Sequence, residues 1–494
     1  MTKILIANRG EIAIRVMRTA KDLGIATVAI YSEADESALH VKYADEAVLI
    51  GPPASNQSYL AIDRIIEACK KTGADAVHPG YGFLSENSEF SQRIADEGLI
   101  FIGPSPDAIR VMGDKLVSKQ AVRGFDVPLV PGMEEPITNL QEAKRVAEDI
   151  GYPIMIKARA GGGGKGMRIV SDPVDFEDQM ERAISEAKNS FGDDAVFIEK
   201  FISSPKHIEV QVMGDRHGDV IHFFERECSI QRRNQKVIEE APCALMTSEI
   251  RDKITRAAVN VAKACDYYGA GTVEFIADSD LNFYFLEMNT RLQVENPVTE
   301  MITGVDLVKE QIRVAEGKPL SYKQEDIKIQ GHSIEVRVYA EDPENEFLPD
   351  IGKLQVYKPP LGNGVRLDDA FEEGMNIPIY YDPMIAKLVT FGQTRTEAMD
   401  RMIRAIQDYC IVGIKTTLPF CNFVMQHKSF RDGTFTTKFV DEHFKAVYLK
   451  EEIDESEALA AIAVYLSENT SEQRRKTSIQ RHSTSAWKQR SKSR

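Results

Sequence analysis

Disulfide and zinc motifs are missing from this sequence. Its six cysteines include no Cys-x-x-Cys pair, and its nine histidines form no His-x-His or His-Glu-x-x-His motif. Apolar runs of membrane-spanning length are also missing, and a strand pattern starts at Lys3-Ile4-Leu5-Ile6-Ala7, which leaves no room for a signal peptide. We therefore expect a cytoplasmic protein with no membrane partner.

Positive charge is in deficit. The formal net charge is -15 and the pI is near 5.3, so the chain would repel a phosphate backbone, and we expect no nucleic-acid partner. A local basic cleft could still bind ATP. With 494 residues and 43% hydrophobic composition, the chain is long enough for about three domains with ordinary cores.

The first region alternates short apolar runs with helical patterns, which predicts a Rossmann-like parallel α/β domain. Its first turn, Asn8-Arg9-Gly10-Glu11, has one glycine where a dinucleotide fingerprint needs three, so NAD binding is not indicated. A structural turn is the better interpretation.

Shifts in composition along the sequence indicate the domain boundaries. We expect an α/β domain at 1–112, an α+β domain at 113–330 and a separate β-rich domain at 331–446. The residues 447–494 are expected to form a helical extension, with an amphipathic helix at 453–466, and a disordered basic tail at 471–494. Strand-like alternation in the second domain occupies 195–200, 207–213, 220–225, 271–277 and 283–288, with helices at 248–266 and 305–316.

A glycine run, Ala160 to Met167, follows the apolar strand 153–157. Such a loop lets backbone N–H groups approach phosphate oxygens. A Walker A motif would need glycine at Arg159 and Ser or Thr at Gly166, so a P-loop fold is excluded. A flexible linker is the alternative, and taken alone the two interpretations are nearly even.

Two alternating runs, 272–276 and 283–289, predict a β-hairpin. If Ile276 pairs with Phe285, Glu274 lies opposite Glu287, and Asn289 shares their face. Opposed carboxylates destabilise a sheet unless a cation lies between them, and carboxylate and amide oxygens suit Mg²⁺. The hairpin therefore predicts a magnesium site, with solvent exposure or arginine pairing as the alternative.

The segment after the hairpin, 290–297, carries a second set of polar residues. Pro297 favours extended geometry at Asn296, which would align Arg291, Gln293 and Glu295, with a helix beginning at Pro297. Arginine and glutamine can donate to a small oxyanion while glutamate accepts its proton. A surface ion pair between Arg291 and Glu295 is the alternative.

These residues make the sequence resemble biotin carboxylase, over about residues 1 to 446. The resemblance is carried by four motifs: Ala7-Asn8-Arg9-Gly10-Glu11-Ile12-Ala13, His78-Pro79-Gly80-Tyr81-Gly82-Phe83-Leu84-Ser85-Glu86-Asn87, the glycine run, and Glu287-Met288-Asn289-Thr290-Arg291-Leu292-Gln293-Val294-Glu295.

The resemblance implies a pre-ATP-grasp domain, an ATP-grasp domain with a mobile lid at about 131–203, and a C-terminal β-rich domain. It implies that ATP, with Mg²⁺ or Mn²⁺, phosphorylates bicarbonate to carboxyphosphate, whose CO₂ is transferred to biotin on a separate carrier. This would be the first half-reaction of an acyl-CoA or pyruvate carboxylase; acetyl-CoA carboxylase would place it in fatty acid biosynthesis.

Site residues are carried over by position. The nucleotide contacts implied are Lys115, Lys157, Gly163, Gly164, Lys165, Gly166, Glu199, Lys200, Phe201, Ile202, His207, Gln231 and Asn234, together with Glu274 and Glu287. The implied metal ligands are Glu274, Glu287 and Asn289. The implied bicarbonate and biotin contacts are Lys236, Arg291, Gln293 and Val294, with Glu295 as general base and Arg337 stabilising an enolate-like biotin oxygen. Asn234 departs from the histidine common in the family, and Arg159-Ala160 from smaller residues.

No methionine is followed by lysine, so the chain lacks the Met-Lys-Met motif that carries biotin. We therefore expect a standalone subunit that works with a biotin carboxyl carrier protein and a carboxyltransferase, and the resemblance implies a homodimer. Two alternatives are another ATP-grasp ligase, such as a carbamoyl-phosphate-forming or purine-pathway enzyme, and a regulatory subunit without turnover. The second would be expected to lack some of Lys236, Arg291, Glu295 and Arg337, and all four are present.

Overall fold

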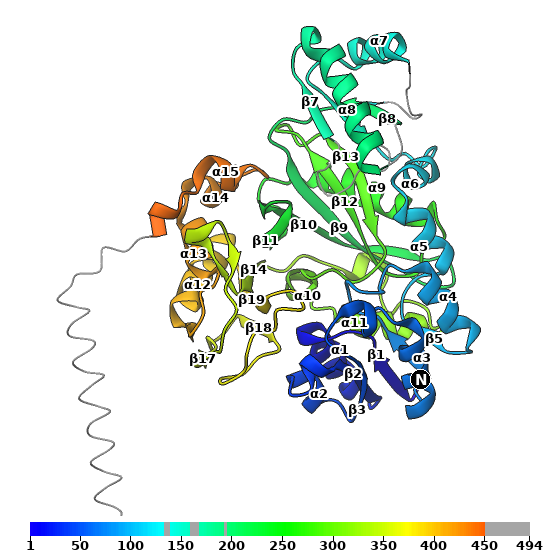
Figure 1. Ribbon diagram of the computed structural model, residues 1–494, viewed down its shortest axis with the longest axis vertical. Coiled ribbons are helices and arrows are strands. Elements are labelled where there is room, and N and C mark those ends of the chain that lie inside the picture. Colours follow the sequence, from blue (N-terminus) through cyan, green and yellow to red (C-terminus); the bar gives the residue numbers. More distant parts are fainter. Residues whose placement is uncertain (133–138, 159–166, 192–194, 450–494) are drawn as a thin grey trace, which may run out of the picture. The chain divides into compact units, whose positions relative to one another are not determined.

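The computed structural model describes residues 1–132, 139–158, 167–191 and 195–449 (Figure 1). Residues 1–444 form one compact unit, and residues 445–494 form a second. Three predictions fall outside the described residues: the phosphate contacts Gly163, Gly164, Lys165 and Gly166, the helix at 453–466 and the disordered tail at 471–494.

The N-terminal part contains a five-stranded parallel sheet with the order β3-β2-β1-β4-β5. Its central strand is inaccessible to solvent at Ile4, Leu5 and Ile6, as expected of a parallel strand covered on both faces. The predicted Rossmann-like α/β fold is confirmed. Its elements are β1 (Lys3–Ile6), α1 (Gly10–Asp22), β2 (Ala26–Ser32), α2 (Leu39–Tyr43), β3 (Glu46–Gly51), α3 (Ile62–Thr72), β4 (Ala76–His78), α4 (Ser88–Asp96) and β5 (Ile100–Phe101).

A small three-stranded sheet, β7-β6-β8, lies within the predicted lid segment. Helices α7 and α8 bury Ala147, Met180 and Ala187 in the same apolar cluster as Ile154 and Ile198 of the sheet. The elements from the end of the first domain to this sheet are α5 (Pro106–Gly113), α6 (Lys115–Ala121), α7 (Leu140–Ile150), β6 (Ile154–Ala158), β7 (Met167–Val170), α8 (Phe176–Phe191) and β8 (Val196–Lys200).

An eight-stranded sheet with the order β13-β12-β9-β10-β11-β14-β19-β18 holds the site described below. It runs from the second predicted domain into the third, because Ile238 on β11 pairs with Val336 on β14. The second and third predicted regions thus share one sheet. The strands are β9 (Lys206–Gly214), β10 (Val220–Arg232), β11 (Gln235–Ala241), β12 (Gly269–Ala277), β13 (Phe283–Asn289), β14 (His332–Tyr339), β18 (Val365–Asp369) and β19 (Met384–Gly392).

The β12–β13 hairpin has the predicted partners at the site but not at its far end. Glu274 pairs with Glu287, as predicted, whereas Ile276 pairs with Tyr284 rather than Phe285. The cause is a β-bulge between Glu274 and Phe275, which inserts an extra residue into one strand. Alternation alone gives no sign of such a bulge.

Helix α10 (Asn296–Thr303) begins one residue earlier than predicted, and Asn296 is helical rather than extended. Glu295, the residue before it, has φ -80° and ψ 15°, so the extended run through 290–297 was wrong. Pro297 lies in the first turn, where its missing N–H costs no helical hydrogen bond.

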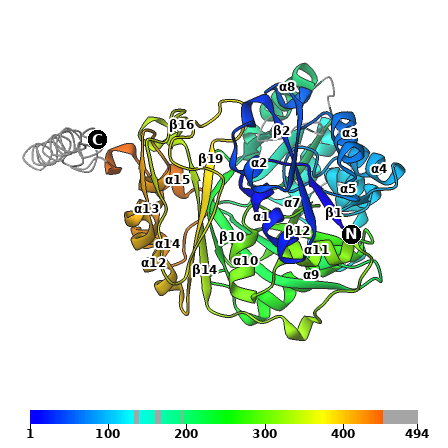
Figure 2. The same ribbon diagram turned by 90° about the horizontal axis from the view of Figure 1, so that it is seen from below.

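The remaining helices cover the sheet. Helix α12 packs against β14 and β19 (Figures 1 and 2). These helices are α9 (Ser248–Lys263), α11 (Leu307–Ala315), α12 (Arg395–Asp408), α13 (Leu418–Gln426), α14 (Lys428–Arg431) and α15 (Phe439–His443). Four short strands lie outside the large sheets: β15 (Glu341–Asp342), β16 (Leu348–Pro349), β17 (Val356–Lys358) and β20 (Cys410–Val412). No helix in the described part of the chain is long and apolar enough to cross a membrane.

Candidate active site

A cavity of about 730 Å³ opens over the eight-stranded sheet and is bounded by all three predicted regions. Tyr81 comes from the first region, Glu274 from the second and Arg337 from the third. Eleven of the predicted site residues line it: His207, Gln231, Asn234, Lys236, Glu274, Glu287, Asn289, Arg291, Gln293, Val294 and Arg337.

The predicted metal ligands come together on the β12–β13 hairpin. Glu274 lies opposite Glu287, and the Asn289 Nδ2 donates to Glu274 Oε1 at 2.8 Å. Burial raises the pKa of the Glu287 carboxyl, and the nearby Glu274 charge raises it further. A divalent cation would relieve this repulsion, so the oxygen donors fit Mg²⁺.

Glu274 also contacts residues of the other predicted sets. Its Oε1 accepts from Lys236 Nζ at 2.9 Å and from Gln293 Nε2 at 3.1 Å, and its Oε2 lies 3.1 Å from His207 Nε2. Burial opposes ionisation, but Lys236 and His207 hold the pKa of Glu274 well below its ordinary value. Glu274 is therefore an ionised carboxylate between the predicted metal, nucleotide and bicarbonate contacts.

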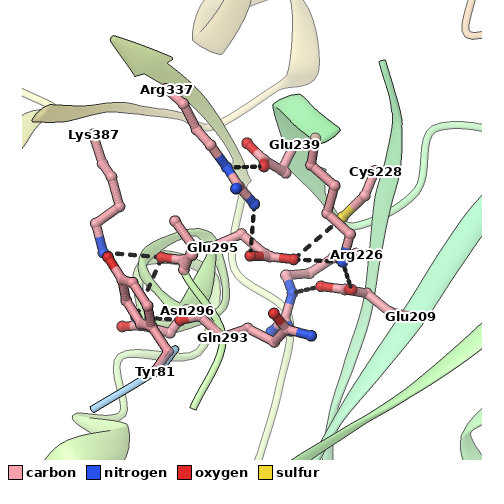
Figure 3. Close-up of polar contacts among 12 residues, drawn as sticks. Tyr81, Glu209, Arg226, Cys228, Glu239, Gln293, Glu295, Asn296, Arg337 and Lys387 are labelled. Carbon is pink, nitrogen blue, oxygen red and sulfur yellow. Dashed lines mark hydrogen bonds and ion pairs between the residues drawn. The ribbon is translucent and has the colours of Figure 1, made fainter. Parts of the chain in front are cut away.

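Glu295 lies behind the cavity wall and is inaccessible to solvent. Its Oε1 accepts from Lys236 Nζ at 2.8 Å and its Oε2 from Arg337 Nη2 at 3.0 Å. Figure 3 shows the Arg337 guanidinium between Glu295 and Glu239, whose Oε1 lies 2.6 Å from Nε. The predicted base and two predicted cations thus form one buried charge cluster.

The cluster fixes the charge of its members. Burial would raise the pKa of Glu295, but Lys236 and Arg337 hold it well below its ordinary value. Burial would lower the pKa of Lys236, but Glu209, Glu274 and Glu295 raise it well above the ordinary value. Glu295 is ionised and Lys236 is a cation at neutral pH.

Arg291 does not pair with Glu295. Its Nε donates to Glu86 Oε2 at 2.8 Å, while Nη1 donates to Gln293 Oε1 and Nη2 to Asn289 Oδ1, each at 3.0 Å. Glu86 also accepts the Thr290 backbone N–H at 3.0 Å. The alternative of a surface Arg291–Glu295 ion pair is therefore wrong, and Glu86 orients the guanidinium towards the cavity.

The predicted nucleotide contacts divide into two groups. His207, Gln231 and Asn234 line the cavity, and Gln231 Nε2 lies 3.1 Å from His207 Nδ1. Asn234 occupies the β10–β11 turn with φ 66°, a left-handed conformation that asparagine adopts more readily than most residues.

The other group lies outside this cavity. Within this group, the Glu199 carboxylate pairs with the Lys157 and Lys119 ammonium groups. The Phe201 backbone N–H donates to the Pro153 carbonyl oxygen at 3.1 Å. Its members are Lys115, Lys157, Glu199, Lys200, Phe201 and Ile202.

The sequence reasoning missed the carboxylates beneath the site. Glu209 binds Lys236 and the fully buried Arg226, and Glu239 binds Arg337. In β9, the apolar residues Ile208 and Val210 face the core and Glu209 lies between them on the opposite face of the strand. In the sequence, this alternation indicates that the face carrying Glu209 is exposed to solvent. Only the packing of α10 against β10 and β11 shows that this face is covered.

Comparisons with known proteins identify this arrangement. The chain matches the sequence models for the biotin carboxylase N-terminal domain over residues 1–109, the carbamoyl-phosphate synthase L chain ATP-binding domain over 114–323 and the biotin carboxylase C-terminal domain over 335–442. Together these describe a three-domain, ATP-binding carboxylating enzyme.

Curated relatives agree. Biotin carboxylase 1 of Bacillus subtilis is 51% identical over 442 residues, which are 89% of this chain and 98% of the relative. A pyruvate carboxylase subunit of Methanothermobacter thermautotrophicus is 52% identical over 446 residues, 90% of this chain and 91% of the relative. The mitochondrial propionyl-CoA carboxylase α chain of Mus musculus is 52% identical over 483 residues, 97% of this chain but only 67% of the relative.

A solved structure carries the ligands. The biotin carboxylase domain dimer of Hydrogenobacter thermophilus 2-oxoglutarate carboxylase, in complex with MgADP, ADP and bicarbonate, matches with a TM-score of 0.83 and 49% identity, covering 92% of this chain and 99% of that one. The chain belongs to the biotin carboxylase family of ATP-dependent ligases. The predicted fold class, enzyme class and cofactors ATP and Mg²⁺ are thereby confirmed.

Proposed function

We propose that this chain carboxylates biotin on a separate carrier, using ATP, Mg²⁺ and bicarbonate. The observation that carries the proposal is the buried Lys236–Glu295–Arg337 cluster beside the Glu274, Glu287 and Asn289 oxygens. The cluster provides two cations and an ionised carboxylate for a small oxyanion. The hairpin provides ligands for the divalent cation that ATP requires.

Bicarbonate would bind to the Arg291 guanidinium, which Glu86 and Gln293 already orient, and to Lys236. Glu295 would accept the bicarbonate proton, so that a bicarbonate oxygen attacks the γ-phosphate of ATP; the bond from the γ-phosphorus to ADP breaks, ADP leaves, and carboxyphosphate forms. Drawing Lys236 towards bicarbonate would remove one cation from Glu295 and raise its basicity.

Arg337 would act in the second step. Its guanidinium lines the cavity, keeps its charge in a buried setting and can donate to the ureido oxygen of biotin as that oxygen gains negative charge. Carboxyphosphate would break into CO₂ and phosphate, the phosphate would take the proton of the biotin nitrogen, and that nitrogen would form its bond to CO₂.

The roles proposed for the nucleotide follow from the resemblance and from position. His207 and Gln231 would contact it from the cavity, and Lys157 would contact phosphate after leaving Glu199. Phe201 and Ile202 would bracket the adenine. The domain limits of 1–112, 113–330 and 331–446, with the lid at about 131–203, are proposed on the same basis.

A biotin carboxyl carrier protein and a carboxyltransferase are the proposed partners, in a homodimer like that of the Hydrogenobacter domain. Because relatives include propionyl-CoA and pyruvate carboxylase chains, we propose an acyl-CoA or pyruvate carboxylase without choosing the acceptor. Acetyl-CoA carboxylation and fatty acid synthesis are not singled out. The cytoplasmic location stays a prediction, since some relatives are mitochondrial.

The test is carboxylation of free biotin by the wild-type chain and by Glu295→Ala, with ATP, Mg²⁺ and bicarbonate. Removing a general base lowers turnover by about 100-fold or more. Glu325→Ala, at an exposed glutamate, is the matched control. Wild-type turnover without dependence on biotin or bicarbonate would contradict the proposed activity, and full turnover of Glu295→Ala would contradict the role of Glu295.

A further inference from the structure

The Arg337 guanidinium is held from two sides. Its Nε donates to Glu239 Oε1 at 2.6 Å and its Nη2 to Glu295 Oε2 at 3.0 Å (Figure 3). Tyr339 OH lies 3.4 Å from Nη1. Glu239 does not line the cavity, so it reaches the substrates only through Arg337.

Glu239 has a second carboxyl group beside it. On the paired strands β11 and β14, Glu239 lies directly opposite Glu335, and both side chains are inaccessible to solvent. Within the described part of the chain, Glu239 Oε2 and both oxygens of Glu335 have no hydrogen-bond partner. Two opposed carboxylates with three unpaired buried oxygens would be strongly destabilising.

Burial favours one proton on the pair, while the surrounding charges act in both directions. The pKa of Glu239 is lowered by Arg337 and Lys236 and raised by Glu295. The pKa of Glu335 is lowered by Lys387 and Arg337 and raised by Glu239 and Glu295. Lys387 is committed elsewhere, with Glu11 at 3.2 Å and the Val294 carbonyl at 2.9 Å. Burial raises the pKa of Glu239 to about 7 and that of Glu335 well above its ordinary value.

We propose that Glu239 is a positioning residue for Arg337, and that Glu335 is kept as the neutral acid and donates its proton to the free oxygen of Glu239. Glu335 then satisfies Glu239 Oε2 without adding charge, while Glu239 Oε1 keeps its charge-assisted bond to Arg337. This inference rests on the proposed function, because it assigns Glu239 to the biotin-carboxylating step.

The bond to Glu239 prevents the Arg337 guanidinium from forming a two-hydrogen-bond ion pair with Glu295, the proposed base. With Nε bound to Glu239, only Nη2 contacts Glu295, and the guanidinium faces the cavity. Without Glu239, the guanidinium would be free to bind Glu295 with two parallel hydrogen bonds. Both groups would then be withdrawn from the substrates.

The first test is Glu239→Gln, which keeps the size of the side chain and removes its charge. We expect kcat for free biotin to fall by at least about tenfold, as for a small misplacement of a catalytic group, with the KM for ATP unchanged. Glu240→Gln is the matched control, because Glu240 is the next residue on β11 and binds Arg395 and His332 instead. It should keep kcat for biotin.

Glu335 is tested by a pair of variants. Glu335→Leu removes the hydrogen-bond donor and should lower kcat for biotin as Glu239→Gln does. Glu335→Gln is neutral and can still donate a hydrogen bond, so it should keep the wild-type kcat. The folded wild-type chain at neutral pH should show an infrared carbonyl band of a protonated carboxyl group that Glu335→Gln lacks.

Three results would overturn the inference: equal loss of kcat in Glu239→Gln and Glu240→Gln, loss in Glu335→Gln as large as in Glu335→Leu, or an infrared spectrum in which Glu335→Gln removes no band. A wild-type chain that does not carboxylate biotin would instead refute the proposed function, which separates the two failures. Thermal unfolding of each variant shows that the folded chain is being compared.

Discussion

Lys236 Nζ lies 2.9 Å from Glu274 Oε1, so a predicted bicarbonate ligand directly contacts a predicted metal ligand. Gln293 and Asn289 donate to the same oxygen. Glu274 Oε1 thus accepts hydrogen bonds from three side chains. If Glu274 binds the cation as proposed, we expect the cation to compete with Lys236 for this carboxylate and so to favour movement of Lys236 towards bicarbonate.

Metal dependence should respond to the hairpin. In Glu287→Gln, one carboxylate ligand is lost but the fold keeps its shape, so the Mg²⁺ concentration for half-maximal biotin carboxylation should rise by about tenfold or more. A Mg²⁺ titration at saturating ATP measures this, with the exposed Glu325→Gln as control. An unchanged Mg²⁺ requirement would remove Glu287 from the metal site.

Bicarbonate recognition should need the planar guanidinium of Arg291 with its several N–H donors, and not only a positive charge. Arg291→Lys keeps the cation but loses the bonds that join Glu86, Gln293 and Asn289. We expect the KM for bicarbonate to rise by about tenfold, with the KM for ATP unchanged. A parallel rise in both constants would instead indicate a general disturbance of the cavity.

Stability should depend on the fully buried Arg226. Its guanidinium binds Glu209, Gln211, Thr299 and Thr272, and Arg226→Met would leave Glu209 a buried carboxylate with Lys236 as its remaining cation. Breaking such a pair costs about 3–5 kcal/mol.

Arg182→Met is the matched control for Arg226→Met, because Arg182 pairs with Asp178 on an exposed helix surface. Chemical unfolding should place this control within experimental error of the wild type. Equal effects of the two variants would show that burial of Arg226 contributes nothing.

Acid stability should follow two buried histidines. Burial lowers the pKa of His40 and of His78 to about 4. In the unfolded chain each takes up a proton below about 6.5, so the stabilisation is complete above that pH and is lost as the pH falls towards 4. The loss is ~1.4 kcal/mol per pH unit for each histidine.

The measurement is the midpoint of thermal unfolding between pH 7 and pH 4.5. His78→Gln should flatten its decrease with falling pH, while the exposed His217→Gln should leave the slope as it is. A wild-type midpoint that does not fall over this range would contradict the assignment of neutral, buried imidazoles.

The spacing of apolar residues predicted most strands and helices, because the pattern of each element is carried by residues close together in the sequence. It placed Glu274 opposite Glu287 correctly, since the bulge lies beyond that pair, but it missed the shift at Ile276. It also treated Asn296 as extended from the identity of Pro297 alone, whereas α10 begins there.

Residues that act through distant contacts were harder to find. Glu239 and Glu335 lie about a hundred positions apart in the sequence and meet only because β11 pairs with β14. Nothing in either strand's own sequence predicts that pairing. The resemblance supplied Arg337 and Glu295, but not Glu239, which holds Arg337 from the other side, or Glu335.

The pairing of β11 with β14 also decides how the chain can be divided. A fragment ending at Gln330 would lose the partner of Ile238, Glu239 and Glu240 and present a bare hydrogen-bonding edge to water. Such a fragment is expected to self-associate rather than survive as an isolated nucleotide-binding module. The residues proposed for phosphorylation and those proposed for carboxyl transfer therefore depend on one continuous sheet.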